Sequence, residues 1–280
     1  MKKITRRSFL AAAAVSAAAL ALTACGGSSS SVASSVASSA AASSEAASTS
    51  AAAGELTTVE AGKLTMATNA TFPPYEMTTD SGEFEGIDIE TAQAIADKLG
   101  LELQIDDMDF DAALLSVQQG KADIVMAGVT VTDERKAVMD FSDSYATGIQ
   151  SIIVPEGSDI ASPDDMAGKK IGTQRGTTGY IYCSDDFGDE NVVAYDDGLT
   201  AVQALNNGQV DAVVIDNAPA QEFIAANPGL KILDTSYAEE DYAIGMAKNS
   251  PLEDAVNSVL EELKADGTLQ AIVDKYITAE

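Results

Sequence analysis

The chain contains no histidine and only two cysteines among its 280 residues. Without histidine it cannot form the Ser–His or Cys–His pairs that activate catalytic nucleophiles, and it lacks the commonest transition-metal ligand of proteins. Cys25 lies close to the amino terminus, so the rest of the chain holds only Cys183, which cannot form an internal disulfide. Such a lone thiol is more often a small packed side chain than a reactive group. We therefore expect no metal site and no cofactor.

Positive charge is also scarce. Sixteen Lys and Arg residues face 44 Asp and Glu residues, which gives a formal net charge of −28. A body with this charge repels nucleic acid and anionic lipid surfaces, and an anionic ligand would need a local cation to hold it. No glycine-rich nucleotide loop of the Walker type occurs. These absences exclude a nucleic-acid partner and disfavour nucleotide binding.

The first 24 residues have the layout of a secretory signal peptide. Residues 2–7 carry four positive charges, residues 9–22 form an apolar run too short to span a bilayer, and small residues precede Cys25. The segment 22–25 resembles the lipobox of bacterial lipoproteins, which implies cleavage before Cys25 and lipid on its thiol and new amino group. An ordinary buried cysteine is the alternative. Arg6 and Arg7 could belong to a twin-arginine signal, so the export route stays open.

A low-complexity stretch follows the expected cleavage site. Residues 26–54 are almost all Ser, Ala and Gly, and Glu45 is their only charge. This composition cannot build a core, so residues 25–55 are predicted to form a flexible tether behind a lipidated cysteine. A globular body then begins near residue 56. Without the four positive charges of the signal peptide, the net charge changes from −28 to −32.

Hydrophobic periodicity predicts alternating strands and helices along this body. We expect strands at residues 63–67, 101–105, 122–127, 151–154, 169–173, 212–215 and 242–247. We expect helices at residues 89–99, 111–119, 200–207, 217–226, 252–264 and 269–276.

One unit occurs twice in this pattern. Residues 114–125 and residues 202–213 each consist of a helical segment, a glycine, an aspartate and an apolar strand. The repeat predicts two similar α/β lobes. Alternating β and α elements favour parallel sheets, with ligands bound at the carboxyl ends of the strands.

Residues 86–96, which read GIDIETAQAIA, resemble the signature of the polar amino-acid family (family 3) of extracellular solute-binding proteins, although Thr91 stands where the family usually has an apolar residue. The resemblance extends over residues 63–276. It implies an α/β, two-lobed periplasmic-binding-protein-like fold of type II, with two crossover hinge strands. Lobe 1 would comprise residues 56–150 plus 245–280, and lobe 2 residues 151–244.

The segment 127–136 carries the main candidate binding residues. By the resemblance, Arg135 pairs with the α-carboxylate of an amino acid, while Thr130 and the carbonyl of Gly128 meet its α-ammonium. A planar guanidinium suits a carboxylate, and oxygen acceptors suit an ammonium. A plain helix start, with Asp133 and Glu134 complementing the helix dipole, is the alternative for those two acids.

Further candidates come from three other segments. In the segment 173–179, Thr177 and Thr178 would complete the carboxylate site at a helix start. Asp216 follows a predicted buried strand and could be a helix N-cap, but by the resemblance it pairs with the α-ammonium. The family places aromatic residues around the ligand, and the matching residues here are Phe72, Tyr75 and Phe110. Packing in the core is the alternative for them. Asn69 occupies a position that usually faces the ligand's side chain.

Arg175 occupies a position that usually faces the ligand's side chain. It disfavours a cationic ligand, so we expect a polar amino acid that is uncharged or acidic. If Arg175 instead folds outward to pair with Asp185 or Asp186, the cleft loses this cation, and the negative charge of Glu76 could determine the ligand preference.

The resemblance implies a monomeric amino-acid-binding lipoprotein, extracytoplasmic and lipid-anchored to the bacterial cell membrane, that catalyses nothing. It would deliver its ligand to an ABC permease with an ATPase subunit, both expected to be separate chains. Two alternatives remain on the same fold. One is a ligand-sensing module, although sensors usually continue into a transmembrane helix and this chain stops at Glu280. The other is an enzyme related to cyclohexadienyl dehydratases, for which the cleft offers no obvious general base.

Overall fold

The computed structural model describes residues 56–277, and the expectations for the signal peptide, Cys25 and the tether lie outside this range. Its first half is built on β1 (Lys63–Thr68), which pairs in parallel with β5 (Glu102–Asp107) and β6 (Ile124–Val125). We call this half lobe 1. Its helices are α1 (Ile87–Leu99), α2 (Phe110–Gln118), α3 (Asp133–Val138), α7 (Glu253–Ala265) and α8 (Thr268–Tyr276).

The second half, lobe 2, repeats this plan. Strand β8 (Ile171–Gln174) pairs in parallel with β9 (Val192–Tyr195) and β10 (Ala212–Asp216). The helices are α4 (Thr178–Phe187), α5 (Gly198–Asn206) and α6 (Asn217–Ala226). A short strand, β11 (Leu230–Ile232), lies at the edge.

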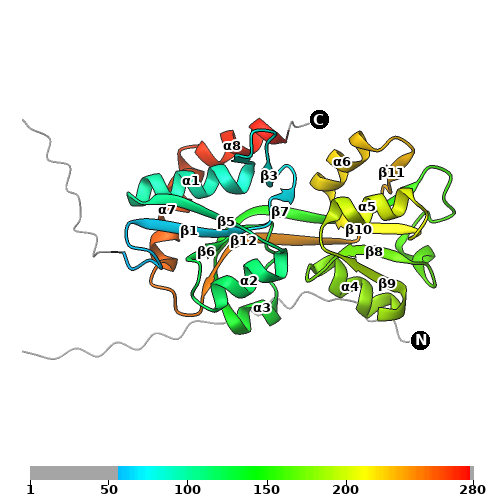
Figure 1. Cartoon of the computed structure of the whole chain (residues 1–280), viewed down its shortest axis with the longest axis horizontal. Helices are drawn as coiled ribbons and strands as arrows, with labels where there is room; N and C mark the ends of the chain where they lie inside the picture. The colour runs from blue at the N-terminus through cyan, green and yellow to red at the C-terminus, as the bar shows by residue number, and fades with distance from the viewer. Residues whose placement is uncertain (1–55, 278–280) are drawn as a thin grey trace, which may run out of the picture. The chain divides into compact units, whose positions relative to one another are not determined.

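Two long antiparallel strands join the lobes (Figure 1). Strand β7 (Met139–Pro155) pairs with β12 (Ala238–Ala247) through residues 139–150, then continues beside β10 and β11. Strand β12 also pairs with β6. The result is one mixed nine-stranded sheet, in the order β5-β1-β6-β12-β7-β10-β8-β9, with β11 as the ninth strand paired to β7. The expected parallel pairing is found within each lobe, and β7 and β12 join the two parallel halves into one mixed sheet.

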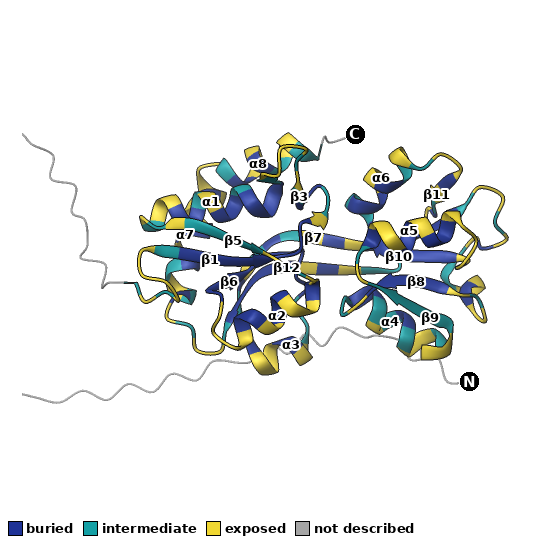
Figure 2. Cartoon of the chain, viewed as in Figure 1, coloured by how far each residue is buried: buried dark blue, intermediate teal, exposed yellow. Residues whose placement is uncertain are grey.

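Helices cover both faces of each half of the sheet. In lobe 1, α1, α7 and α8 bury one apolar cluster around Leu64 and Met66, and α2 buries another around Ala113 and Val117. In lobe 2, α5 and α6 cover one face, and α4 packs Cys183 against the other. Figure 2 shows the buried residues concentrated along the strands and the inner faces of these helices. Cys183 is fully buried, as expected for a packed side chain.

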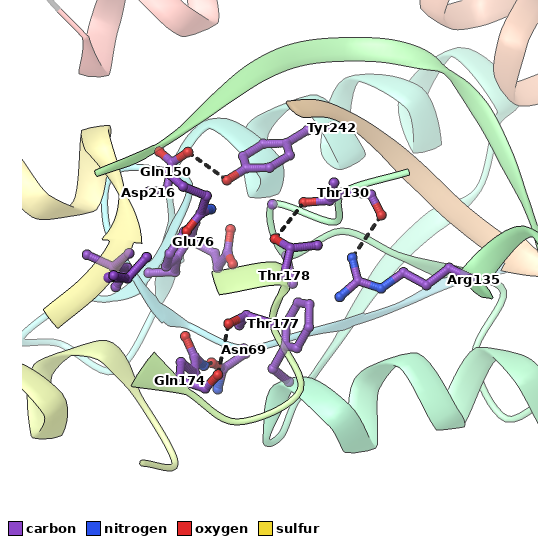
Figure 3. A pocket seen from close by; sticks show the side chains of 16 residues that line it. Asn69, Glu76, Thr130, Arg135, Gln150, Gln174, Thr177, Thr178, Asp216 and Tyr242 are labelled. Carbon is purple, nitrogen blue, oxygen red and sulfur yellow. Dashed lines mark hydrogen bonds between the residues drawn. The ribbon is translucent and has the colours of Figure 1, made fainter. Parts of the chain in front are cut away.

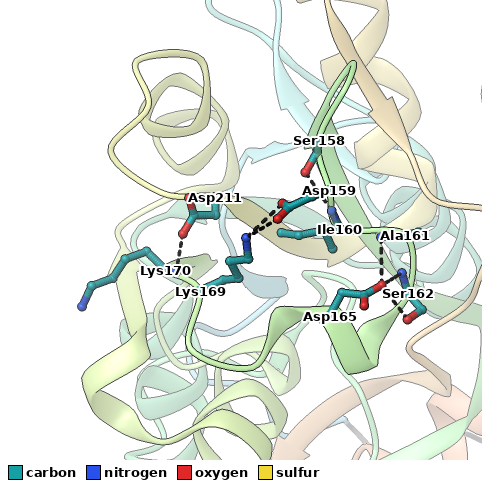
Figure 4. A network of polar contacts seen from close by, with 9 residues as sticks. All are labelled: Ser158, Asp159, Ile160, Ala161, Ser162, Asp165, Lys169, Lys170 and Asp211. Atoms are coloured by element: carbon teal, nitrogen blue, oxygen red, sulfur yellow. Dashed lines mark hydrogen bonds and ion pairs between the residues drawn. The ribbon is translucent and has the colours of Figure 1, made fainter.

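The repeated helix–Gly–Asp–strand unit has a shared structural role. In lobe 1, Asp123 accepts hydrogen bonds from the backbone N–H groups of Val59 (2.7 Å) and Thr65 (2.8 Å). In lobe 2, Asp211 accepts one from the N–H of Lys170 at 2.8 Å (Figure 4). Each aspartate therefore anchors the central strand of its lobe, β1 or β8.

The loop between β7 and β8 is held by its own polar contacts (Figure 4). Ser162 and Asp165 form a reciprocal capping box on a 3-10 helix, Pro163–Met166. The Nζ of Lys169 lies 2.9 Å from Asp159, and this contact lowers the pKa of the Asp159 carboxyl.

A small three-stranded sheet follows β1. It comprises β2 (Thr71–Phe72), β3 (Glu76–Thr78) and β4 (Phe84–Glu85), none of which was predicted from the sequence. Gly86 ends this sheet with φ 129°, and a Cβ there would lie 2.2 Å from the carbonyl oxygen of Tyr75. Only glycine therefore allows α1 to start directly behind β3.

A second 3-10 turn, Asp189–Asn191, lies between α4 and β9 in lobe 2.

Most predicted elements are found within a few residues of their expected positions. The main differences are β9, which was not predicted, α4, of which only the start was expected, and the first twelve residues of β7. The exact residue boundaries of the two lobes stay a prediction. Among residues 56–277, no helix is both long and apolar enough to cross a membrane.

Candidate binding site between the lobes

A cavity lies where the carboxyl ends of the parallel strands of the two lobes face each other (Figure 3). About 30 Å³ within it is open to the centres of water-sized molecules, which is room for roughly two waters. An amino acid therefore needs the lobes to part before it can enter. The lining residues are Asn69, Phe72, Glu76, Phe110, Ala127, Gly128, Thr130, Arg135, Gln150, Gln174, Thr177, Thr178, Val214, Ile215, Asp216 and Tyr242.

Arg135 lies in α3 and points into this cavity (Figure 3). Its side chain donates to the carbonyl of Thr130 at 2.8 Å and, across the cleft, to the carbonyl of Gly176 at 3.1 Å. Its guanidinium carbon lies 5.3 Å from the centre of the Phe110 ring. Arg135 is only 8% exposed, burial lowers its pKa, and it forms no ion pair within residues 56–277. A buried guanidinium without a carboxylate can receive an anion.

The start of α4 faces Arg135 from lobe 2. Thr177 caps this helix, because its hydroxyl accepts from the N–H of Tyr180 at 3.3 Å and donates to the carbonyl of Gln174 at 2.8 Å. The hydroxyl of Thr178 instead donates to Glu240 at 2.9 Å. Thr178 can therefore offer an anion its backbone N–H at the first turn of the helix, but not its hydroxyl proton.

Asp216 ends β10 and lines the cavity from lobe 2. Its Oδ1 accepts from the N–H of Ala218 at 3.1 Å, so it is the N-cap of α6. Its Oδ2 accepts from the N–H of Ile149 and the hydroxyl of Tyr242, both at 2.8 Å. Burial raises its pKa to about 6. The helix-cap interpretation is therefore confirmed, and the same buried carboxylate also faces the cavity.

Glu240 lies on β12 behind the cavity and is 7% exposed. Its Oε2 accepts from the hydroxyls of Thr130 (3.1 Å) and Thr178 (2.9 Å) and from the amide of Gln150 (3.1 Å). One carboxylate thus connects lobe 1, lobe 2 and β7. Because Thr130 donates its proton to Glu240, its oxygen presents lone pairs to the cavity.

Asn69 and the aromatic residues close the lobe 1 side. The Oδ1 of Asn69 accepts from the amide of Gln174 at 2.7 Å, which is a second bond across the cleft. Phe72 and Phe110 line the cavity. Tyr75 does not line it: it is 3% exposed, stacks on Phe72 with ring centres 5.7 Å apart, and contacts the edge of Tyr242. Tyr75 therefore belongs to the core behind Phe72, as its alternative interpretation stated.

Arg175 lies outside the cavity, contrary to expectation. It is exposed, and its Nη2 lies 3.3 Å from Asp196 Oδ1. The preceding residue, Gln174, ends β8 with its side chain in the cavity, and successive side chains of an extended chain face opposite ways. The argument against a cationic ligand loses its basis, because Arg135 is the only Lys or Arg among the residues that line this cavity.

Glu76 is the most buried acid of the lining, with no exposed surface. Neither of its carboxyl oxygens receives a hydrogen bond from a donor within residues 56–277. Burial and the neighbouring Asp88 raise its pKa well above the ordinary value. Asp88 also accepts from the N–H of Gly128 (3.0 Å), which fixes the loop that carries this glycine at φ 55°.

Four polar residues of the cavity lining were not assigned as binding residues from the sequence: Glu76, Gln150, Gln174 and Tyr242. Gln174 directly ends a predicted βα unit, so the strand-end rule used for Asp216 could have found it. Gln150 and Tyr242 lie on the strands that join the lobes, and no local pattern indicates which of their residues face the cleft.

Comparisons with known proteins identify relatives of this chain. A model of bacterial extracellular solute-binding proteins, family 3, matches residues 64–279. The L-cystine-binding protein TcyJ of Escherichia coli is 33% identical over 226 residues, which cover 79% of this chain and 85% of the relative. The arginine-binding extracellular protein ArtP of Bacillus subtilis is 32% identical over 228 residues, 78% of this chain and 87% of the relative.

A solved structure supports the fold. The arginine-, lysine-, histidine-binding protein ArtJ of Geobacillus stearothermophilus matches with a TM-score of 0.75 and 33% identity, over 78% of this chain and 96% of that one. The expected two-lobed α/β fold is confirmed. With the match of the family model over most of the body, these findings lead to one conclusion: the chain belongs to family 3 of the bacterial extracellular solute-binding proteins.

Proposed function

We propose that this protein captures a free amino acid between its two lobes and delivers it to an ABC importer. The observation that carries the proposal is the buried guanidinium of Arg135, which has no ion-pair partner within residues 56–277 and faces a buried carboxylate, Asp216, in the same cavity. A zwitterion supplies the two missing charges. Its carboxylate would dock on Arg135 and the first turn of α4, and its ammonium on Asp216, Thr130 and the carbonyl of Gly128.

We further propose that the preferred ligand has a cationic side chain. The cavity is lined by Glu76 and Asp216 but by only one cation, Arg135, which the α-carboxylate would neutralise. A cationic side chain would then complement the remaining acid, Glu76. Relatives are named for arginine as well as for cystine, and the arginine-binding relative supports a cationic ligand.

The protein acts, in this proposal, as a monomer held at the outer face of the cell membrane by lipid on Cys25. The lipobox-like segment and the Ser/Ala-rich residues 26–54 support the anchor. Substitution Cys25→Ser should release the protein from membrane fractions and remove the mass of the lipid. Unchanged fractionation and mass would refute the anchor while leaving ligand capture intact.

We infer that the chain binds without catalysis and that permease and ATPase are separate chains. Its relatives are named as binding proteins, and the acids of the cavity are arranged as acceptors for a bound cation. An assay of prephenate and arogenate turnover tests the enzymatic alternative: product formation would overturn this inference.

A thermal-shift screen tests the proposed function directly. The twenty amino acids, with ornithine and cystine, are added one at a time to the full chain. A ligand that binds the folded chain raises the melting temperature, and we expect the largest rise for arginine, lysine or ornithine. A screen in which every amino acid leaves the melting temperature unchanged would overturn the proposal.

A further inference from the structure

Two buried carboxyl groups adjoin each other at the wall of the cavity. Glu76 begins β3 and lines the cavity, and Asp88 is the second residue of α1, directly behind it. Both have no exposed surface. The backbone N–H of Asp88 donates to the carbonyl of Tyr75 at 2.8 Å, and the two carboxyl groups are within hydrogen-bonding reach of each other.

The donors around this pair serve only one of its four oxygens. Oδ2 of Asp88 accepts from the N–H of Gly128 (3.0 Å) and the hydroxyl of Tyr145 (2.8 Å). Oδ1 of Asp88 and both oxygens of Glu76 receive no donor from residues 56–277. Two adjacent buried carboxylates without a cation do not both stay ionised. A proton on Glu76, donated to Oδ1 of Asp88, satisfies an otherwise unpaired oxygen.

The acidic neighbours of the pair favour the protonated form of Glu76, and Arg135 is the cation that opposes it. Asp107 at the end of β5 adds negative charge beside Glu76, and Asp216 faces the same cavity from lobe 2. The hydroxyls of Tyr75 and Tyr145 stay neutral, because burial raises their pKa values far above 10. Arg135 is the only cation of the cavity lining, and it is assigned to the ligand's α-carboxylate.

The order of protonation follows from these surroundings. Burial and the charge of Asp88 raise the pKa of Glu76 well above its ordinary value, whereas the pKa of Asp88 rises only to about 6. The N–H of Gly128 and the hydroxyl of Tyr145 stabilise the ionised form of Asp88. Because these donors reach Asp88 and none reaches Glu76, Asp88 is the more acidic member of the pair and the shared proton resides on Glu76.

We propose that Glu76 and Asp88 form a proton-sharing carboxyl pair that receives the cationic side-chain group of the bound amino acid and releases its proton to solvent as that group docks. This inference rests on the proposed function. The balance is simple: the ligand keeps all its protons, Glu76 loses one, and the N–H groups of the ligand replace that proton as donors. Before binding, Glu76 is neutral, so the cavity does not hold a second buried carboxylate without a partner. On binding, Glu76 becomes ionised and its negative charge faces the cation of the ligand.

Titration calorimetry of the full chain with L-arginine tests this coupling. Repeated in phosphate and in Tris at several pH values, it gives the number of protons released per ligand bound. We expect up to one proton per arginine near neutral pH, so that affinity rises by up to about tenfold per pH unit. L-Glutamine, a neutral probe of similar length, should release none.

Two isosteric variants separate proton sharing from mere proximity. Glu76→Gln cannot release a proton, so proton release should vanish and arginine affinity should fall by at least tenfold. In Asp88→Asn, the amide N–H can replace the shared proton and stabilise ionised Glu76, so arginine should still bind, with proton release near zero. Asp80→Asn, an exposed acid beyond β3, is the matched control and should behave as the parent chain.

The outcomes distinguish this inference from the proposed function. If arginine binds and releases no proton in the parent chain, the shared proton is refuted, and ligand capture still stands. If no amino acid binds, the proposed function fails and this inference fails with it. Carboxyl carbon NMR of Glu76 gives a readout without ligand: a carboxyl that titrates near its ordinary value of 4.5 would refute the pair whatever binds.

Discussion

At the scale of single residues, Arg135 and Arg175 form a natural pair for comparison. Arg135 is buried and faces the cavity, whereas Arg175 is exposed beside Asp196. We expect Arg135→Ala to weaken amino-acid binding by about 2–5 kcal/mol, because the ligand's carboxylate would be buried without its partner. Arg175→Ala should change it by less than about 0.5 kcal/mol, since an exposed ion pair contributes little. Calorimetry on both variants checks this.

Unfolding curves of the same two variants provide the control, because Arg135 also donates to two backbone carbonyls. A folded Arg135→Ala variant that loses less than about tenfold in affinity, or 1.4 kcal/mol, would contradict the carboxylate assignment.

The same two arginines show how far residue-level reasoning extends. The place of Arg135 in the cavity could be predicted from the family motif in residues 127–136, and that of Asp216 from the buried strand that it ends. The place of Arg175 could not, because a shift of one residue along extended chain reverses the direction of a side chain. Glu240 bonds to Thr130 and Thr178, which lie 110 and 62 residues away, and no local pattern reports such contacts.

At the scale of elements, β7 and β12 determine how the lobes are joined. The sequence predicted only residues 151–154 of β7, which form a continuous buried run. Residues 139–150 alternate irregularly between buried and exposed, because this part crosses between the lobes and packs on neither core alone. For helix α4 only the start was expected, and only three of its ten residues are buried. Elements with strong one-sided burial were predictable, and those that bridge or border the cleft were not.

Gly148 on β7 provides a test of this junction. A Cβ at this position would lie 2.5 Å from the ring of Tyr242, whose hydroxyl donates to Asp216. We expect Gly148→Ala to displace that ring, to lower the free energy of unfolding by about 1–3 kcal/mol and to weaken ligand binding. Chemical denaturation and calorimetry measure both effects.

The neighbouring exposed residue gives the matched control for the junction. Thr147→Ala changes an exposed side chain at a position of the same strand that is paired with Asp241, and should leave stability and binding close to those of the parent chain. Equal effects of the two substitutions on unfolding and binding would contradict the role of the contact between residue 148 and Tyr242.

At the scale of the whole molecule, buried acids make stability depend on pH in an unusual direction. The pKa of Asp216 is about 6 in the folded chain, against 3.8 ordinarily. The folded chain therefore binds this proton more tightly than the unfolded chain, so stability should fall as pH rises from about 4 to about 6. A shift of this size corresponds to at most about 3 kcal/mol. The formal net charge of −28 acts in the same direction.

Urea unfolding at pH 5 and pH 7.5 measures this difference. The parent chain should be more stable at pH 5, and Asp216→Asn, which keeps a helix cap but cannot ionise, should reduce the difference. Acids with lowered pKa values, such as Asp140, lose their contribution only below about pH 4, outside this window. Greater stability of the parent chain at pH 7.5 would contradict the argument.

The two lobes are held together across the cleft by a small number of direct hydrogen bonds, and this makes closure adjustable. Gln174 donates to Asn69 at 2.7 Å, and Arg135 donates to the carbonyl of Gly176 at 3.1 Å. A single hydrogen bond contributes about 0.5–1.5 kcal/mol net, which is enough to change a ratio of closed to open forms by roughly two- to tenfold. Because the ligand must enter a cavity that these bonds close, binding requires opening first and closure afterwards.

We therefore expect saturating ligand to reduce the radius of gyration in small-angle scattering. Gln174→Ala should open the ligand-free chain further, so its radius should fall by more on binding than that of the parent chain. Gln93→Ala removes a hydrogen bond of similar length, 2.8 Å to Asp97, from the exposed face of α1 and should not alter the change. Identical profiles with and without ligand in all three chains would refute ligand-driven closure, because a ligand shifts a conformational equilibrium only when it binds one form more tightly.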